Sequence, residues 1–472
     1  MKRSILSALL LFAVLFTFVA CGDCAGEKKS GFITLDVPDR QPGQTDVLGL
    51  KLDPIPTVRV AFVGVGGRGS DAVRRFTYIP GVEIVAICDV EEERVKNSNK
   101  FLAERGLPAA QEYYGDTAVW RKAVAQENVD LVYICTPWTD HTPMAVQAMK
   151  EGKNVAIEVP AARTVAECWE LVNTAEQTRK HCMMLENCTY DEFEMATLNM
   201  AQQGLFGTVV HVEGAYLHEL LGLNFGDAYW NMWRLKENTE RNGDIYPTHG
   251  LGPVCQVLDI HRGDKMNYLV SMSTDQFGMT QYATERFGPD SEYAKTKYRM
   301  GDNTTTIIKT EKGKTIMIQH DVTSPRPYSR IHQISGTKGF AQKWPCEGIA
   351  IESSLLPDEL KKKYPNQSAH YNVSPELMKD LMEYYKHPFY IEIGEMAKEV
   401  GGHGGMDFVM DYRLVYCLRN GLPLDMDVYD AAEWSCLGEL TGLSIDNYSA
   451  PVAMPDFTRG AWNKIQGLKF AQ

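Results

Sequence analysis

A glycine-rich run directly after a β-branched stretch has the residue types and spacing to bind a dinucleotide. Its pattern is G-x-G-x-x-G, and it contains Gly64, Gly66, Gly67, Arg68 and Gly69. Glycines are needed there because the backbone turns tightly and approaches a pyrophosphate at a helix N-terminus. Alone, such a run is a weak signal, since glycines of this kind also occur in plain turns.

An acidic residue after the next strand-like run strengthens the interpretation. Residues 83–88 are mostly apolar, and Asp89 follows them. A carboxylate at this place binds both ribose hydroxyls and repels a 2′-phosphate, which favours NAD over NADP. The two motifs together predict an NAD site.

Polar and aromatic residues also follow three later strand-like runs, over residues 130–135, 154–157 and 182–186. In open α/β sheets, ligands bind beyond the carboxyl ends of the strands. We therefore expect one edge of the sheet to hold the nicotinamide and a substrate. The residues expected there are Thr136 to His141, which include Trp138, together with Glu158 and Asn187.

Candidates for acid–base chemistry are His249, Tyr190, Tyr246 and Tyr328, the last two only through the family resemblance given below. His249 lies in a loop flanked by Gly and Pro rather than on an apolar stripe. A Tyr or His can act as a base where cationic or amide neighbours lower its pKa, and Arg234 and Arg330 can supply that charge. Because the chain has 22 tyrosines, a packing role is the alternative for each tyrosine.

The other histidines and the cysteines are less informative. His403 lies in a glycine-rich run with Asp407 beyond it, so it is either part of a flexible turn or a site residue. His211 and His218 are interpreted as structural. Cysteines beyond the N-terminal segment, such as Cys88, Cys135 and Cys182, fall in apolar runs without C-x-x-C spacing, so we expect no metal site.

The predicted elements alternate between strand and helix from residue 57 to residue 185, which predicts an N-terminal Rossmann domain in an α/β protein. Strand-like segments near 209–217, 303–310, 314–320 and 330–335 then have no regular helical alternation. Residues 186–472 are therefore predicted to form an α+β domain on a mainly antiparallel sheet, for substrate binding and homo-oligomerisation.

The N-terminus carries an export signal in the sequence. Two basic residues precede an apolar run up to Ala20, which is typical of a secretory signal over residues 1–20. Cys21 after a small residue resembles the lipoprotein box of bacteria, so we expect lipidation at Cys21 and a tether over residues 21–56. A plain signal peptide without lipid is the alternative. The resulting location is the bacterial cell envelope, with a lipid anchor as the only membrane contact.

The composition excludes one class of partner. The net charge is −13, and the chain has no long basic run. Nucleic-acid binding depends on Lys and Arg neutralising phosphates. We therefore expect no nucleic-acid partner.

The combined motifs resemble the glucose-fructose oxidoreductase/inositol dehydrogenase superfamily. The resemblance rests on the segments around His141 and Glu158 and on the antiparallel domain that follows. Dehydrogenases of that superfamily usually carry Glu-Lys-Pro and an Asp four residues before an active-site His. Here Val159 takes the Lys position and Ile245 the Asp position, so the usual proton-transfer pair is absent.

A closer resemblance is to the family-109 glycoside hydrolases. It rests on the glycine-rich run with Arg68 and on the segments Trp138–His141, 158–161 and 246–250. That family comprises α-N-acetylgalactosaminidases that use NAD without net redox change. The resemblance implies NAD contacts from Arg68, Asp89, Trp138, His141, Glu158, Val159 and Asn187. It implies a sugar site formed by Tyr216, Arg234, Tyr246, His249 and Tyr328.

The mechanism implied by the resemblance is oxidation at C3 of the sugar, removal of the C2 proton and elimination of the leaving group. Water addition and re-reduction complete the cycle. It differs from the usual glycosidase mechanism, in which two carboxylates flank the scissile bond. The alternatives are an NAD-dependent sugar oxidoreductase with net redox turnover and a non-catalytic sugar-binding lipoprotein. Val159 and Ile245 count against the first, and the intact cofactor loop counts against the second.

Overall fold

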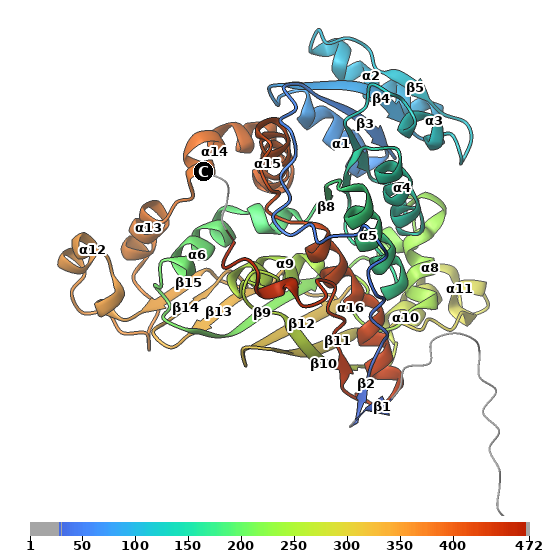
Figure 1. Cartoon of the computed structure of the whole chain (residues 1–472). Helices are drawn as coiled ribbons and strands as arrows, with labels where there is room; N and C mark the ends of the chain where they lie inside the picture. Colours follow the sequence, from blue (N-terminus) through green and yellow to red (C-terminus); the bar gives the residue numbers. More distant parts are fainter. Residues whose placement is uncertain (1–27, 30, 469–472) are drawn as a thin grey trace, which may run out of the picture.

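The computed structural model describes residues 28–29 and 31–468, and it contains two β-sheets with helices packed on them (Figure 1). The predicted signal segment and Cys21 lie outside the described residues. Among the helices of the described residues, none has the length and apolar character needed to span a bilayer.

The first sheet has six parallel strands in the order β5-β4-β3-β6-β7-β8. Its strands are β3 (Val58–Val63), β4 (Val82–Cys88), β5 (Gln111–Tyr113), β6 (Leu131–Ile134), β7 (Asn154–Ile157) and β8 (Cys182–Met184). Its helices are α1 (Gly67–Phe76), α2 (Glu92–Glu104), α3 (Trp120–Val124), α4 (Trp138–Lys150) and α5 (Val165–Thr178). Strands β6 and β7 are buried along their whole length, as continuous apolar runs in a parallel sheet predict. The predicted Rossmann fold is confirmed.

The second sheet has ten strands in the order β1-β2-β16-β10-β11-β12-β9-β13-β14-β15, antiparallel except for the pairs β2–β16 and β12–β9. Its strands are β1 (Lys28–Lys29), β2 (Phe32–Ile33), β9 (Val209–Leu217), β10 (Met266–Ser273), β11 (Asn303–Thr310), β12 (Thr315–Asp321), β13 (His332–Gly336), β14 (Gly339–Gln342), β15 (Gly348–Ile351) and β16 (Val452–Ala453). A mainly antiparallel sheet after residue 186 is confirmed.

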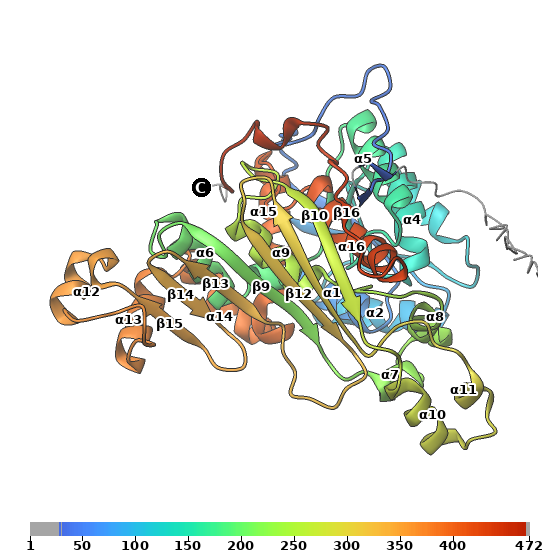
Figure 2. The ribbon, with the colours of Figure 1, turned by 90° about the horizontal axis from the view of Figure 1, so that it is seen from below.

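Helices of the second domain cover one face of this sheet. The α-helices are α6 (Glu192–Gln202), α7 (Leu221–Asn224), α8 (Trp233–Glu240), α9 (Thr248–Val257), α10 (Gly278–Phe287), α11 (Glu292–Lys295), α12 (Asp358–Lys363), α13 (Pro375–Tyr384), α14 (Pro388–Val400), α15 (Met406–Asn420) and α16 (Val428–Asp446). Short 3₁₀ turns are η1 (Asn187–Tyr190), η2 (Trp230–Met232), η3 (Ser353–Leu355), η4 (His403–Gly405) and η5 (Ala461–Asn463). Helix α9 packs on β9, β12 and β13. Figure 2 looks onto the opposite face, where the strands lie in front of the helices.

The last long helices return to the Rossmann domain. Helix α15 packs against α1 and β3, and α16 packs against α5 and β8 (Figure 1). At this contact the buried carboxylate of Asp411 accepts hydrogen bonds from Arg75 Nε at 2.7 Å and from the Tyr133 hydroxyl at 2.9 Å. The chain beyond residue 186 therefore completes the core of the first domain as well as forming the second.

The segment over residues 31–56 differs from the expected tether. Val47 and Leu48 are buried, and the Val47 amide donates to the Tyr429 hydroxyl at 3.0 Å. Arg40 Nη2 lies 2.9 Å from a carboxylate oxygen of Glu176 on α5. A composition rich in Gly, Pro and Asp argues against a helix, but it does not prevent an extended chain from packing along α5 and α16.

Candidate active site

A cavity of about 970 Å³ extends from the carboxyl ends of the six-stranded sheet to the second domain. It collects most of the residues that the sequence predicts for the cofactor and the sugar. Those lining it are Gly64, Gly66, Gly67, Arg68, Asp89, Trp138, His141, Glu158, Val159, Asn187, Tyr216, Arg234, Tyr246, His249 and Tyr328. Gly69 and Tyr190 do not belong to this lining.

The glycine-rich run forms the turn between β3 and α1. Gly64 has φ +84°, and a Cβ there would lie 2.7 Å from the carbonyl oxygen of Cys135. A Cβ on Gly69 would lie 1.9 Å from the carbonyl oxygen of Gly64. Gly69 therefore allows α1 to pack against the turn, which corrects the predicted cofactor contact. No side chain caps the N-terminus of α1, so its first N–H groups suit a pyrophosphate.

Asp89 follows β4 and is held in place by the backbone. Its Oδ2 accepts from the Val65 amide at 2.8 Å and its Oδ1 from the Glu91 amide at 3.0 Å. Arg94, which also lines the cavity, lies with Nη1 3.4 Å from Asp89 Oδ1. The carboxylate keeps lone pairs available for the hydroxyls of a ribose.

Arg68 connects three elements at the centre of the cavity. Its Nη2 lies 2.9 Å from Glu158 Oε1 and its Nη1 2.8 Å from Asp407 Oδ2. Asp407 also accepts from Asn187 Nδ2 at 2.5 Å, and its Oδ2 lies 2.9 Å from His403 Nδ1. Burial raises the pKa of Asp407, but Arg68 and His403 outweigh it and hold that pKa well below its ordinary value. His403 and Asp407 are therefore part of the site.

His141 joins the two loops that follow β6 and β7. Its ring nitrogens lie 2.8 Å from the carbonyl oxygens of Pro160 and Thr136. Burial lowers its pKa, against the opposing effect of the two carbonyl groups. Its imidazole therefore holds the loops that carry Trp138 and Glu158 in the cavity wall.

Aromatic rings and one guanidinium form a wall of the cavity, with Trp138 from the Rossmann domain and the other groups from the second domain. The Trp138 and Tyr246 rings stack with centroids 5.4 Å apart, and Tyr216 meets Tyr246 at 4.8 Å. The Arg234 guanidinium lies 4.5 Å from the Tyr246 ring centroid, in cation–π contact. Burial raises the pKa of Tyr246 well above its ordinary value, although Arg234 opposes the shift. The hydroxyl of Tyr246 is therefore protonated at neutral pH and suited to donate a hydrogen bond.

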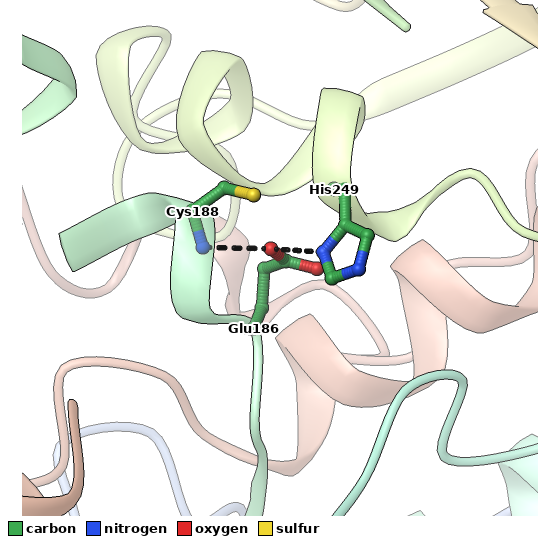
Figure 3. A group of neighbouring side chains, drawn as sticks. All are labelled: Glu186, Cys188 and His249. Carbon is green, nitrogen blue, oxygen red and sulfur yellow. Dashed lines mark hydrogen bonds and ion pairs between the residues drawn. The ribbon is translucent and has the colours of Figure 1, made fainter. Parts of the chain in front are cut away.

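His249, at the start of α9, reaches the end of β8. Its Nδ1 lies 2.8 Å from Glu186 Oε1 (Figure 3). Burial and the cations Arg330 and Arg68 lower the pKa of His249, and Glu186 raises it; the net direction is downward. The imidazole is therefore neutral at neutral pH and able to accept a proton.

Glu186, Cys188 and His249 offer ligand atoms within 4.8 Å of one another, so the three residue types could together hold a metal ion (Figure 3). The guanidinium of Arg330 lies against this group, with Nη1 2.6 Å from Cys188 Sγ. Its positive charge opposes a cation at the thiol. We expect no metal to be resident there.

The sequence interpretation overlooked Glu186 and Cys188, although both flank Asn187 at the carboxyl end of a predicted strand. Their position at the carboxyl end of that strand could have predicted them as site residues, because ligands bind beyond this edge of the sheet. His218, interpreted as structural, lines the cavity and stacks edge-on against Tyr328 with centroids 4.7 Å apart. His211 lies on β9 outside the lining, with Nδ1 2.8 Å from the Thr315 hydroxyl.

Tyr190, a predicted catalytic candidate, points into the core instead. Its hydroxyl donates to Asp425 at 3.2 Å, and the residue is 1% exposed. Asp425 is also bound by Arg413 in a buried ion pair with a distance of 2.7 Å. Asn187 and Tyr190 are the two ends of η1, yet Asn187 lines the cavity whereas the Tyr190 hydroxyl is bound to Asp425 in the core.

Comparisons with known families cover both domains. Residues 58–186 match the oxidoreductase family with an NAD-binding Rossmann fold. Residues 190–464 match the C-terminal domain of glycosyl hydrolase 109. The first match assigns NAD as the cofactor of the Rossmann domain, as the sequence predicts.

Relatives and solved structures agree with these matches. Glycosyl hydrolase family 109 protein 1 of Bacteroides fragilis strain YCH46 is 53% identical, over 99% of this chain and 98% of its own length. An α-N-acetylgalactosaminidase of Bacteroides fragilis strain ATCC 25285 is 54% identical, over 90% of this chain and 97% of its own. A levoglucosan dehydrogenase in complex with NADH shares the fold, with a TM-score of 0.62 at 15% identity over 84% of this chain and 99% of that chain.

The family resemblance in the sequence is thus confirmed by matches along both domains and by relatives over nearly the whole chain. The cavity joins the NAD edge of the Rossmann sheet to an aromatic wall of the second domain. This chain is an NAD-dependent glycoside hydrolase and belongs to glycosyl hydrolase family 109.

Proposed function

We propose that the enzyme hydrolyses terminal α-N-acetylgalactosaminides by oxidation, elimination, water addition and re-reduction, with no net change in NAD. The sugar is supported by the relative named α-N-acetylgalactosaminidase, which is 54% identical. The mechanism is supported mainly by one observation: His249 and Tyr246 line the same cavity as the cofactor loop, where burial lowers the pKa of His249 and raises that of Tyr246.

The residues present fit NAD. The turn with Gly64 and the uncapped start of α1 suit the pyrophosphate, and Asp89 suits a ribose. Glu158 and Asn187 at the sheet edge would hold the nicotinamide end. When bound there, NAD supplies a hydride acceptor and, later in the cycle, a hydride donor.

The chain itself supplies the proton transfers. His249 is the proposed base for the C2 proton, because its imidazole is neutral and one ring nitrogen remains free of the Glu186 contact. Tyr246 is the proposed hydrogen-bond donor to the sugar. The charge of Arg234 beside Tyr246 stabilises negative charge that develops on an oxygen of the substrate.

The incorporation of deuterium tests this mechanism. Aryl α-N-acetylgalactosaminide is hydrolysed in D₂O by the NAD-loaded enzyme, and the released sugar is analysed by NMR. Deuterium at C2 is expected, because a base removes that proton before water adds. Hydrolysis without deuterium at C2 contradicts the elimination mechanism, even if the sugar specificity is correct.

A sugar oxidoreductase with net redox turnover is the second candidate, and two positions speak against it. Val159 and Ile245 are buried apolar residues where the dehydrogenases carry Lys and Asp. Net NADH formation with free N-acetylgalactosamine, followed at 340 nm, would favour this candidate over hydrolysis.

The cellular location and the assembly are also proposals. We propose an exported protein of the cell envelope, anchored through lipid on Cys21, from the apolar run before that residue. We propose that the face of the ten-stranded sheet seen in Figure 2 contacts a second copy. The exposed apolar side chains Val210, Met272 and Ile307 on β9, β10 and β11 support this choice.

A further inference from the structure

The carboxylate of Glu186 is buried against His249, which lines the active-site cavity, and Glu186 itself does not belong to the lining. The residue is 0% exposed. Its Oε1 lies 2.8 Å from His249 Nδ1 and accepts from the Cys188 amide at 3.0 Å (Figure 3). Its Oε2 has no hydrogen-bond partner within the described part of the chain. Burying a carboxylate costs free energy unless the charge is paired or hydrogen-bonded. For Glu186 the side-chain partner that meets this condition is His249.

The contact defines the tautomer of the imidazole. An ionised carboxylate only accepts hydrogen bonds, so Nδ1 of His249 must carry the proton. In the neutral ring, Nε2 then holds the lone pair, and this is the nitrogen that remains free to accept a proton. Burial raises the pKa of Glu186, but His249, the Cys188 amide and Arg330 outweigh it, so the carboxylate stays ionised.

The partner of His249 comes from an unexpected part of the chain. In related dehydrogenases an Asp stands four residues before the active-site His, and Ile245 occupies that place here, 2% exposed. Glu186 instead reaches His249 from the end of β8, in the Rossmann domain. It directly precedes Asn187, which also lines the cavity.

We propose that Glu186 is the positioning residue for the C2 base: it holds His249 in the Nδ1–H tautomer and directs Nε2 at the sugar. The proposal rests on the proposed function, because it assigns a role within that reaction. The titratable and charged groups around His249 are Glu186, Cys188, Arg330, Arg68, His218 and the rings of Tyr216 and Tyr246. Of these groups, Glu186 is the only anion.

Glu186→Gln is the main test, because it keeps the shape and removes the charge. An amide can donate to Nδ1 and so favour the wrong tautomer. We expect kcat to fall by on the order of 100-fold or more, as for other His bases that lose their carboxylate. KM and bound NAD should stay close to the parent. The acid limb of the pH–kcat profile should move to lower pH, because the charge that raises the pKa of His249 is gone.

Glu433→Gln is the matched control. Glu433 on α16 is also buried against a histidine, with Oε2 2.7 Å from His261 Nε2, but neither residue lines the cavity. This variant should lose stability while its kcat and its pH profile match the parent. A purely structural role for Glu186 predicts the same behaviour in both variants.

Several outcomes overturn the proposal. The proposal is contradicted if the kcat of Glu186→Gln stays within about threefold of the parent value. It is also contradicted if kcat falls but the acid limb of the pH–kcat profile does not move. If the Gln variant does not retain NAD, Glu186→Asp provides the test: it withdraws the charge by one methylene, and an unchanged kcat and acid limb then contradict the proposal.

A parent enzyme without C2 exchange contradicts the proposed function instead. An active, exchanging parent with an unaffected Glu186 variant contradicts only the role of Glu186.

Discussion

Burial shifts the pKa values of His249 and Tyr246 in opposite directions, because it disfavours the charged form of each group. The charged form of an imidazole is the protonated one, whereas the charged form of a phenol is the deprotonated one. Burial in the same cavity wall therefore favours a neutral imidazole at His249 and a protonated phenol at Tyr246, as the proposed roles of base and hydrogen-bond donor require. From the sequence, either a His or a Tyr could be the base. Their opposite pKa shifts favour His249 for this role.

Tyr246→Phe should lower kcat by on the order of 100-fold or more while NAD stays bound, because Tyr246 lines the cavity beside Tyr216 and Arg234, away from the glycine-rich turn, and is the proposed donor to the sugar. Turnover of an aryl glycoside and the NAD content of the purified protein measure the two effects. Tyr190→Phe is the control: it removes a hydroxyl of another buried tyrosine, which contacts Asp425 outside the cavity. It should cost about 1 kcal/mol of stability and leave kcat unchanged. Equal losses of kcat would place Tyr190 in the mechanism after all.

Asp89→Asn should weaken NAD binding by about 10- to 100-fold, since hydrogen bonds from the ribose to a charged acceptor are lost. Arg94 lies 3.4 Å from Asp89, so the variant leaves an unpaired cation beside the ribose. NADP should therefore bind more tightly to the variant than to the parent. Isothermal titration of apoprotein with each nucleotide measures both changes. A parent that already prefers NADP contradicts the role assigned to Asp89.

At the level of elements, strands were easier to predict than the roles of residues at their ends. The segments 209–217 and 303–310 match β9 and β11 residue for residue. Strand β10 (Met266–Ser273) was not predicted; its polar residues do not alternate strictly with apolar ones, and its burial pattern is irregular. The pairing of β10 with β11 and β16 supplies the order that its local sequence lacks.

The junction of β3 and α1 gives a prediction at this scale. Gly69→Ala should lower the Tm by several degrees and reduce bound NAD, because its Cβ would lie 1.9 Å from the Gly64 carbonyl oxygen. Gly67→Ala is the control within the same helix, since a Cβ there meets nothing within 4 Å. It should fold with the Tm of the parent or above. A Gly69→Ala protein with the parent Tm and full NAD content would show that α1 can shift at no cost.

At the scale of the whole molecule, the two domains are less separate than their sequence boundary indicates. Helices α15 and α16 come from the second half of the chain and pack on the Rossmann elements (Figure 1). The segment 31–56 lies along α5 and α16 in the same region. A cut near residue 186 would therefore expose the core of the first domain, and neither half is expected to fold alone.

Cys21→Ser tests the predicted anchor. In a bacterial host that processes lipoproteins, the parent should sediment with the membrane fraction and the variant should move to the soluble exported fraction. Fractionation with immunoblotting measures the distribution, and Cys346→Ser, at an exposed cysteine of the second domain, is the control. An unchanged distribution of the Cys21 variant leaves the plain signal peptide as the interpretation.

The sequence by itself determined the NAD site and the family. Both depend on local order: a strand, a glycine turn and a helix are adjacent in the chain, and the residues after each strand share one edge of a parallel sheet. Arg68, Asp89 and Glu158 could be placed in this way. The motif around His249 could be assigned only through the family resemblance.

Only the tertiary structure decided which groups face one another and how deeply they are buried. Glu186 and His249 are far apart in the chain, and no local pattern pairs them. Tyr190 follows Asn187 closely, yet its hydroxyl contacts Asp425 in the core and the residue does not line the cavity. Ionisation depends on burial and on neighbours from other elements, so the assignment of base and acid requires the assembled fold. A sequence records the order of side chains, whereas their contacts and their dielectric environment arise from packing.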